Sequence, residues 1–199
     1  MIIGITGGIG SGKSYLAQEL AKRGFAVYDC DRAAKRIIAE DKDVQAAIIR
    51  LLGEEAFTDG RYNTAYVAQR VFAEPQLLKK LNKIVHPAVK ADILSPCTSH
   101  LSPLFVESAI LFESGINELC DKIVVVTAPE ETRIARTIAR DYKGEATPEN
   151  INKVRARIRA QKEIPASTEV PQGKILTVVN DDTSVLSSII DRISRFAAG

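Results

Sequence analysis

Five short runs of apolar residues divide the chain, and the longer stretches between them carry apolar residues mostly at helical spacing. The runs lie at residues 1–5, 25–29, 103–107, 122–126 and 174–179. Because each run is apolar almost without interruption, it is typical of a strand buried on both faces. Strands that alternate with helices form parallel sheets. The pattern therefore predicts an α/β fold with a five-stranded parallel sheet flanked by helices.

A long helical segment interrupts this alternation after the second run. Helices are expected at residues 33–38, 44–52, 65–72 and 75–94, with breaks at Gly53, Gly60, Pro75 and Pro87. His86-Pro87 is expected to end an apolar helix, where a lone histidine is more often a capping or core residue than a catalyst. The sequence thus predicts a core domain of residues 1–31 and 102–199 and a helical insertion of residues 32–101.

A glycine-rich segment follows the first apolar run directly. It fits the spacing G-x-x-x-x-G-K-S and reads Gly7-Gly8-Ile9-Gly10-Ser11-Gly12-Lys13-Ser14. Glycines let successive backbone N–H groups turn toward an anion, and the dipole of the helix that follows favours negative charge. Lys13 has the reach for β- and γ-phosphates, and the Ser14 hydroxyl suits Mg²⁺. We therefore expect a nucleoside triphosphate site formed by Gly8, Ile9, Gly10, Ser11, Gly12, Lys13, Ser14 and Tyr15.

Carboxylates end two other predicted strands. Since ligands of parallel sheets gather at the carboxyl ends of the strands, Asp29 and Glu107 are expected near the glycine-rich loop. Asp31 is placed to orient an acceptor hydroxyl and take its proton, although an aspartate before Arg32 is also a favoured helix N-cap. Asp29 and Glu107 are alternative supports for Mg²⁺ through bound water.

A basic segment lies between the fourth and fifth strands. Residues 130–163 hold nine basic and six acidic side chains, and Arg133, Arg136 and Arg140 are spaced to share one helical face. One interpretation is a solvated amphipathic hairpin, since charged helix faces are common. The other is a lid of about residues 140–155 that closes over triphosphate and brings Arg140 to the transferred group.

Composition excludes several classes of protein. The chain has 199 residues, of which 45% are hydrophobic, and its net charge of +2 gives no global field for nucleic acid. Cys30, Cys97 and Cys120 are scattered and odd in number, which argues against a disulfide framework and a zinc site. Neither a secretory leader nor a membrane-spanning apolar stretch is recognisable. We therefore expect a cytoplasmic globular enzyme without membrane or nucleic-acid partners.

With these motifs identified, the chain resembles the dephospho-CoA kinase family along nearly its whole length. The resemblance rests on residues 5–14 and on Asp29-Cys30-Asp31, where the family usually has Asp-Ala-Asp. Shorter matches follow at Leu81 with His86-Pro87, Leu111-Phe112-Glu113, Arg136 to Arg140 with Asp141, and Arg157 to Gln161.

The resemblance implies an ATP- and Mg²⁺-dependent kinase that phosphorylates the 3′-hydroxyl of dephospho-CoA. It implies Asp31 as the base, Lys13 and Ser14 at phosphate and metal, Arg140 of the lid at ATP, and Asn180 near adenine. The helical insertion then receives the acceptor, with expected substrate contacts at Asp31, His86, Leu111 and Glu113. For Leu111, packing is the commoner role of such a residue. A monomer or a weak homo-oligomer is expected.

Three positions depart from the family pattern, and other functions stay open. Tyr15 replaces the usual threonine, Ser108-Ala109-Ile110 stands where Ala-Pro-Leu is frequent, and Gln172-Gly173-Lys174 stands where an alanine-aspartate pair is common. Another small-molecule or nucleoside monophosphate kinase is an alternative, because a fold does not fix the acceptor. A nucleotide-dependent switch or nucleic-acid-associated ATPase is a second, although no Asn-Lys-x-Asp segment and no aromatic platform is present.

Overall fold

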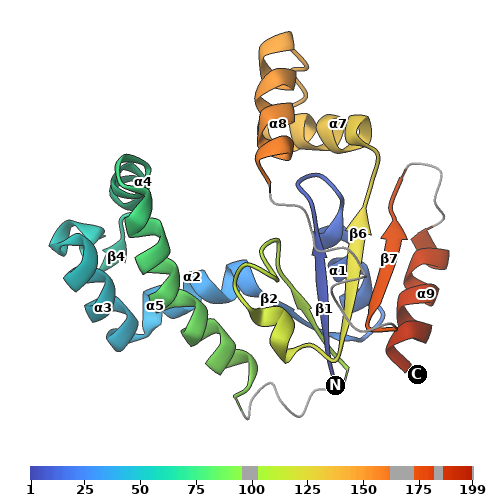
Figure 1. Ribbon diagram of the computed structural model, residues 1–199, viewed down its shortest axis with the longest axis horizontal. Helices are drawn as coiled ribbons and strands as arrows, with labels where there is room; N and C mark the ends of the chain where they lie inside the picture. The colour runs from blue at the N-terminus through green and yellow to red at the C-terminus, as the bar shows by residue number, and fades with distance from the viewer. Residues whose placement is uncertain (96–102, 162–172, 182–185, 199) are drawn as a thin grey trace. The chain divides into compact units, whose positions relative to one another are not determined.

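The computed structural model describes residues 1–95, 103–161, 173–181 and 186–198. It divides into two compact units, a sheet unit of Met1–Tyr28 with Leu101–Gly199 and a helical unit of Asp29–His100. The elements of both units are labelled in Figure 1.

A five-stranded sheet forms the centre of the sheet unit, in the order β2, β5, β1, β6, β7 (Figure 1). The strands span, in that order, Ala26–Asp29, Leu104–Glu107, Ile2–Gly7, Lys122–Thr127 and Ile175–Val179. β1 pairs in parallel with β5 and β6, and β6 pairs in parallel with β7. Each strand coincides with one of the apolar runs to within two residues, so the predicted parallel sheet is confirmed.

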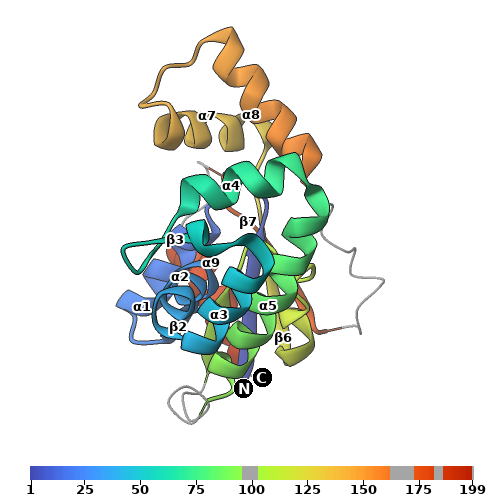
Figure 2. The same ribbon diagram turned by 90° about the vertical axis from the view of Figure 1, so that its left-hand side faces the viewer.

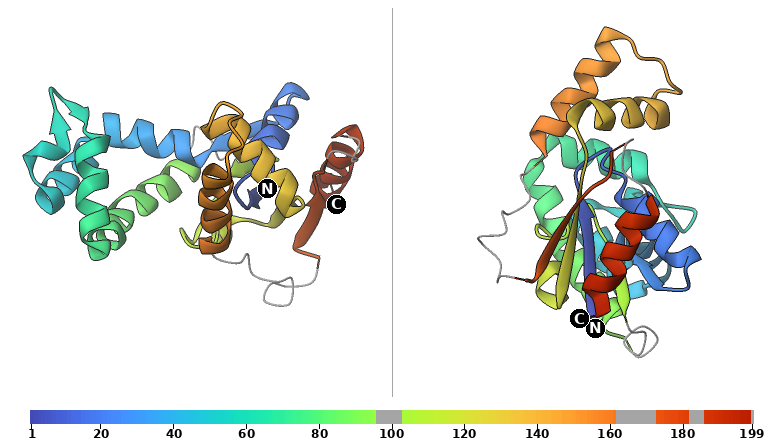
Figure 3. Two further views of the ribbon diagram at one scale, coloured as in Figure 1. Left: turned by 90° about the horizontal axis from the view of Figure 1, so that it is seen from above. Right: turned by 90° about the vertical axis from the view of Figure 1, so that its right-hand side faces the viewer.

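One face of the sheet is covered by α1 (Lys13–Lys22) and α9 (Leu186–Ala198), which lie on the same side of the strands in Figure 3. Ile3 and Ile5 of β1 point into this layer and are fully buried. They share one core with Leu16 of α1 and Ile190 of α9. Removal of such side chains from water is the main stabilising contribution to the fold.

The opposite face is covered by the turns after β5 and by the short 3₁₀ helix η2 (Ile116–Leu119). Gly4 of β1 points to this side, and a Cβ there would lie 2.7 Å from Leu111 Cδ2 and 3.0 Å from Cys120 Sγ. The missing side chain at Gly4 therefore lets Leu111 pack directly on the central strand.

Two helices, α7 (Glu130–Asp141) and α8 (Pro148–Ala160), form a hairpin between β6 and β7. They pack through Ile134 and Ile138 of α7 and Val154 and Ile158 of α8. Thr147 caps α8 by accepting a hydrogen bond from the Asn150 N–H. Residues 142–147 connect the two helices.

The helical unit contains α2 (Cys30–Glu40), α3 (Lys42–Leu52), α4 (Thr64–Ala73) and α5 (Pro75–Ile93), all of which are labelled in Figure 2. α5 is its longest helix, and it contacts the other three. Its buried side chains recur at every fourth position and are Leu77, Leu81, Val85, Val89 and Ile93. This stripe supplies the apolar core of the unit.

The predicted break at Pro87 is wrong, because α5 continues through this residue to Ile93. A proline inside a helix removes one N–H donor and crowds the carbonyl four residues earlier, here that of Lys83. Pro87 and Lys83 are both exposed, so water can satisfy that carbonyl. The buried stripe on the other side of the helix continues past the proline and outweighs the local penalty.

A small β-hairpin, which the sequence analysis missed, lies between α3 and α4. It consists of β3 (Phe57–Thr58) and β4 (Arg61–Tyr62), and the short 3₁₀ helix η1 (Glu54–Ala56) precedes it. Asp59 and Gly60 connect the strands with φ of 50° and 73°, and such a pair favours a two-residue hairpin turn. The Asp-Gly dipeptide was therefore the available signal, but each strand has too few residues to show alternation.

Neither of the two cysteines that the structure describes takes part in a disulfide. Cys30 and Cys120 are both buried, whereas Cys97 lies outside the described residues. Burial raises the pKa of the Cys120 thiol to about 12. Among the helices described, none combines the length and apolar character needed to cross a bilayer.

Candidate functional site

The glycine-rich loop, residues 7–14, connects the central strand β1 to α1. Gly10 and Gly12 have φ of 75° and 88°, in the left-handed region that favours glycine. The Ser11 N–H donates to the Gly8 carbonyl at 3.0 Å and closes the turn. Gly12 is the N-cap of α1 and brings no capping side chain, which leaves the amino end of this helix suited to an anion.

A hollow of about 150 Å³ lies against this loop and the start of α1. Its lining residues are Gly8, Gly10, Gly12, Lys13, Ser14, Tyr15, Arg136, Thr137 and Arg140. The lining includes three basic side chains and no acidic one, so it favours an anionic ligand. The structure thus gathers most of the expected nucleotide contacts around one cavity, together with Arg140 of the expected lid.

Glu107, the last residue of β5, lies beside the first turn of α1. Only 6% of Glu107 is exposed, and its Oε1 accepts a hydrogen bond from Ser14 Oγ at 3.1 Å. The same oxygen lies 3.6 Å from Lys13 Nζ. The lysine charge therefore compensates a carboxylate that is almost completely removed from water.

Ser14 and Glu107 fit a magnesium ion held partly through water. Mg²⁺ prefers oxygen ligands, keeps several waters and is usually held by one or two protein oxygens together with phosphates. The described ranges contain no group of three His, Cys, Asp or Glu side chains that would make an all-protein metal cage. The pair therefore suits the kind of site that is completed by a phosphate ligand.

Side chains from outside the loop hold its backbone. Arg133 Nε donates to the Ile9 carbonyl at 2.8 Å, and the Ile9 N–H donates to Gln161 Oε1 at 2.8 Å. The spacing of the arginines predicts Arg133 on the basic face of α7 and gives no indication of this contact. Gln161 was noted only as the end of a family match, because a single polar residue after a helix gives no signal of its own.

Asn180, which follows β7, also contacts the loop. Its Nδ2 donates to the Ser11 carbonyl at 2.9 Å, and its own carbonyl accepts from Arg136 at 2.9 Å. Its N–H donates to the Thr127 carbonyl at 2.7 Å, and only 7% of the residue is exposed. The family resemblance suggests a place near adenine, whereas in this structure the side-chain amide is directed at the loop.

α7 and Asn180 approach the loop so closely that larger residues would not fit. A Cβ at Gly8 would collide with the Arg133 guanidinium, and one at Gly10 would collide with the Arg133 backbone. At Gly12 it would collide with the Asn180 amide. Backbone atoms crowd Gly10, so a glycine there is required by the protein's own packing, whereas a larger residue at Gly8 or Gly12 would require the side chain of Arg133 or Asn180 to move.

Arg140 lies near the end of α7 and pairs with its neighbour Asp141. Its Nε and one terminal nitrogen donate to the two carboxylate oxygens at 2.7 and 3.2 Å, and Arg157 of α8 donates at 2.8 Å. The Arg140 side chain is 63% exposed, so this pairing contributes little stability and can be exchanged for another anion. Hydrogen bonds from Arg140 and then Arg157 lower the pKa of Asp141 to about 2.

We expect the Asp141 carboxyl to titrate well below the ordinary aspartate value of about 3.9. Because the folded-state pKa is lowered, the ion pairs stabilise the hairpin at higher pH, and this contribution is lost as the pH falls toward about 2. The ¹³C chemical shift of the Asp141 carboxyl, followed against pH, measures the midpoint. Arg157→Ala should raise it, because one of the two donors is removed.

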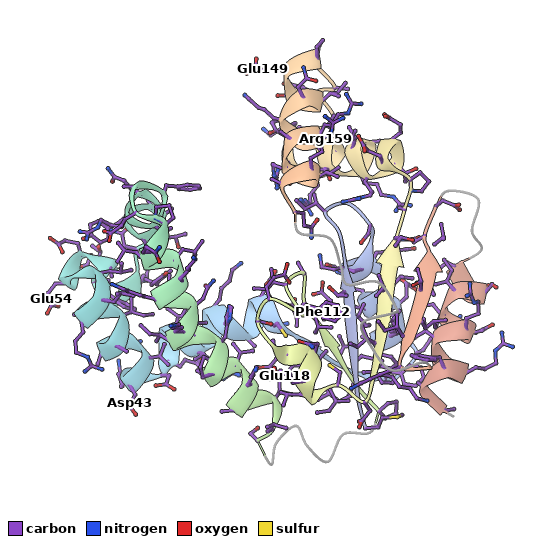
Figure 4. All side chains as sticks on the ribbon, viewed as in Figure 1. Asp43, Glu54, Phe112, Glu118, Glu149 and Arg159 are labelled. Carbon is purple, nitrogen blue, oxygen red and sulfur yellow. The ribbon has the colours of Figure 1, made fainter. Side chains whose placement is uncertain are left out.

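Arg159→Ala is the matched control for this titration. Arg159 is an exposed arginine of the same helix, labelled in Figure 4, and its removal changes the charge of α8 equally. The Asp141 midpoint should stay low in this variant. An ordinary midpoint in the unmodified protein would contradict the ion-pair cluster.

The expected substrate contacts Asp31 and His86, and the alternative metal support Asp29, belong to the helical unit. Asp29, not Asp31, is the N-cap of α2, since its Oδ1 accepts from the Arg32 N–H at 2.9 Å. An N-cap has non-helical dihedral angles. Asp29 is still extended at the end of β2, so it is the cap and the helix begins at Cys30. Asp31 therefore lies in the first turn with its side chain exposed.

The remaining predicted contacts have different surroundings. His86 is half-buried in α5, where burial and then the charge of Lys90 lower its pKa. Leu111 is fully buried beside Gly4, which agrees with a role in packing. Glu113, in the turn that follows β5, is exposed.

Several known proteins are similar to this chain in sequence and in fold. The sequence model of a family described as dephospho-CoA kinase matches residues 1–187. A dephospho-CoA kinase of Porphyromonas gingivalis is 43% identical over 142 residues, 70% of this chain and 69% of the relative. One of Bacteroides fragilis is 36% identical over 196 residues, 96% and 91% of the two chains. A crystal structure of a Thermus thermophilus protein aligns with a TM-score of 0.75 and 32% identity, covering 100% of this chain and 98% of that one.

Proposed function

The chain belongs to the dephospho-CoA kinase family, and on this premise we propose that it transfers the γ-phosphate of ATP to the 3′-hydroxyl of dephospho-CoA. The products are coenzyme A and ADP, and the reaction completes coenzyme A synthesis. The observation that carries the proposal is the basic hollow at the glycine-rich loop, with Lys13, Ser14 and Glu107 side by side.

Alignment and charge neutralisation account for most of the catalysis in phosphoryl transfer, because the transition state is loose. The loop amides hold the phosphate chain, and the Lys13 ammonium balances charge on the β- and γ-phosphates. Ser14 and Glu107 are the residues that would hold Mg²⁺, which when bound neutralises the same phosphates.

Asp31 orients the acceptor hydroxyl and takes its proton late in the reaction. An exposed carboxylate in the first turn of α2 is free to meet a ligand, whereas Asp29 already caps that helix. The sheet order supports this part of the proposal, since β2, which ends at Asp29, is the neighbour of β5, which ends at Glu107. Of the two carboxylates considered for Mg²⁺, Glu107 is preferred, and Asp29 is the alternative.

Arg140 exchanges Asp141 for a phosphate oxygen when the lid of about residues 140–155 closes. The exposed pairing and the place of Arg140 in the lining of the hollow support this step. The helical insertion of residues 32–101 receives the acceptor, with His86 on α5, while Glu113 contacts it from the sheet unit. The enzyme acts in the cytoplasm as a monomer or weak homo-oligomer.

The proposal is tested by measuring ADP release with ATP and different acceptors. Dephospho-CoA should give rapid turnover, and nucleoside monophosphates or no acceptor should give only a background rate. Coenzyme A should appear in an amount equal to the ADP formed. Faster turnover with a nucleoside monophosphate would replace the proposed acceptor, and equal ADP release without any acceptor would indicate an ATPase.

A further inference from the structure

Two carbonyl groups of the glycine-rich loop are held from outside the loop. Arg133 Nε donates to the Ile9 carbonyl at 2.8 Å, and Asn180 Nδ2 donates to the Ser11 carbonyl at 2.9 Å. The two donors come from α7 and from the residue after β7, which are far apart in the sequence. Both carbonyls belong to peptide groups whose other half is a glycine N–H.

Holding a carbonyl fixes the direction of the N–H in the same peptide. A trans peptide group is planar, so the Gly10 N–H points opposite to the Ile9 carbonyl, and the Gly12 N–H points opposite to the Ser11 carbonyl. Within the described part of the chain, neither N–H donates to a protein acceptor. Both glycines line the basic hollow.

The geometry points to Arg133 and Asn180 as positioning residues that aim the Gly10 and Gly12 N–H groups at the polyphosphate. They act through the loop carbonyls, since neither residue is among those that line the hollow. The inference rests on the proposed function only in requiring a polyphosphate ligand, and the acceptor has no part in it.

Anchors of this kind reduce the entropy that a glycine-rich loop loses when it binds a ligand. Glycine is free to adopt many backbone conformations, so an unsupported loop would have to be ordered each time a ligand binds. Asn180 is a rigid anchor, because its own N–H and carbonyl are bonded to Thr127 and Arg136. Arg133 is fixed through its backbone, which accepts a hydrogen bond from Thr137 Oγ1 at 2.8 Å.

The test compares the binding of inorganic tripolyphosphate and ATP by calorimetry. Asn180→Asp keeps the shape of the side chain but replaces the donor with an ionised acceptor, and Asn180→Ala removes it. We expect both variants to bind tripolyphosphate and ATP about tenfold more weakly or worse, by the same factor for the two ligands. Ser188→Asp, on the exposed face of α9, adds an equal negative charge and should change neither.

The two ligands separate this role from recognition of adenine. If Asn180 reads the base, the variants lose affinity for ATP and retain it for tripolyphosphate, and the inference is overturned. Unfolding temperatures measured without ligand show which variants are folded. If Asn180→Asp does not fold, Asn180→Ala decides the question, and unchanged tripolyphosphate binding in a folded variant contradicts the inference.

Arg133→Ala provides an independent arm of the test. It should weaken tripolyphosphate and ATP binding equally, and the loss should persist at high salt, because a local contact is screened much less than a distant charge. Arg192→Ala removes the same charge from the exposed face of α9 and should have little effect. A loss for Arg133→Ala that disappears at high salt would leave only a long-range electrostatic role and overturn the inference.

These outcomes are distinguishable from a failure of the proposed function. A protein that binds tripolyphosphate through the anchored loop but does not phosphorylate dephospho-CoA would disprove the acceptor assignment alone. A protein that phosphorylates dephospho-CoA normally, with folded Asn180 and Arg133 variants that bind tripolyphosphate as tightly as the unmodified chain, would disprove the anchors alone.

Discussion

Lys13→Ala is expected to lower kcat by about a hundredfold to a thousandfold, the usual effect of removing one preorganised charge from a transition state. Lys13 is the lysine of the loop motif, it lines the hollow, and its ammonium lies 3.6 Å from a nearly buried carboxylate. The variant leaves Glu107 without its compensating charge, so the unfolding temperature should fall, but Ser14 still donates to Glu107 and the protein should still fold. Steady-state kinetics and thermal unfolding measure the two effects separately.

Lys22→Ala is the matched control on the same helix. Lys22 is in the last turn of α1, its side chain is 70% exposed, and its ion pair with Glu19 is a surface pair of little energetic value. Its kcat should remain close to that of the unmodified chain. If Lys13→Ala retained a comparable kcat, the loop would not be the site of phosphoryl transfer.

Asp31→Asn is expected to lower kcat by about a hundredfold or more while leaving ATP affinity almost unchanged. The substitution keeps the size of the side chain and removes the group that would orient the hydroxyl and accept its proton. Turnover with dephospho-CoA is compared with a titration of ATP in the absence of acceptor. An equal loss in both measurements would place Asp31 on the nucleotide side and contradict its assignment.

Two other carboxylates at the starts of helices serve as controls for the loss of a negative charge at such a position. Asp43→Asn, labelled at the start of α3 in Figure 4, removes a charge from the first turn of another helix in the same unit. It loses a comparable dipole interaction of about 0.3–1 kcal/mol without affecting turnover. Asp29→Asn keeps the cap, since asparagine caps as well as aspartate. A larger kcat loss for Asp29→Asn than for Asp31→Asn would reverse their roles.

The sheet and the loop were predictable because their signals are local. Each strand is a continuous apolar run, and residues 7–14 combine glycines, a lysine and a serine at a fixed spacing. The same holds for the joint between α7 and α8, where Lys143-Gly144 and Pro148 interrupt the helical pattern. In each case the residues that determine the structure are neighbours in the chain.

Features that depend on packing could not be predicted in this way. The sequence marks Pro87 as a breaker, but the buried stripe of α5 holds the helix together on both sides of it. The choice of Asp29 over Asp31 as N-cap depended on where β2 ends, and sequence patterns locate strand ends only to within a few residues.

The side chains that hold the backbone of the glycine-rich loop could not be predicted from the sequence either. Gln161 and Asn180 contact residues more than a hundred positions away, and nothing in the local pattern at either position indicates it. Asn180 was expected near adenine because the family often has an asparagine there, not at the carbonyl of Ser11. Long-range hydrogen bonds from single polar side chains become visible only when the strands and helices that carry them are placed.

The burial of the Cys120 thiol affects whether the protein can react with disulfides of its own substrate. The acceptor ends in a thiol, and its oxidised forms are disulfides that exchange readily with an exposed thiolate. With its pKa raised to about 12 and its side chain buried beneath β1, Cys120 presents neither a thiolate nor access. At this position the protein is protected from forming a mixed disulfide with its own substrate.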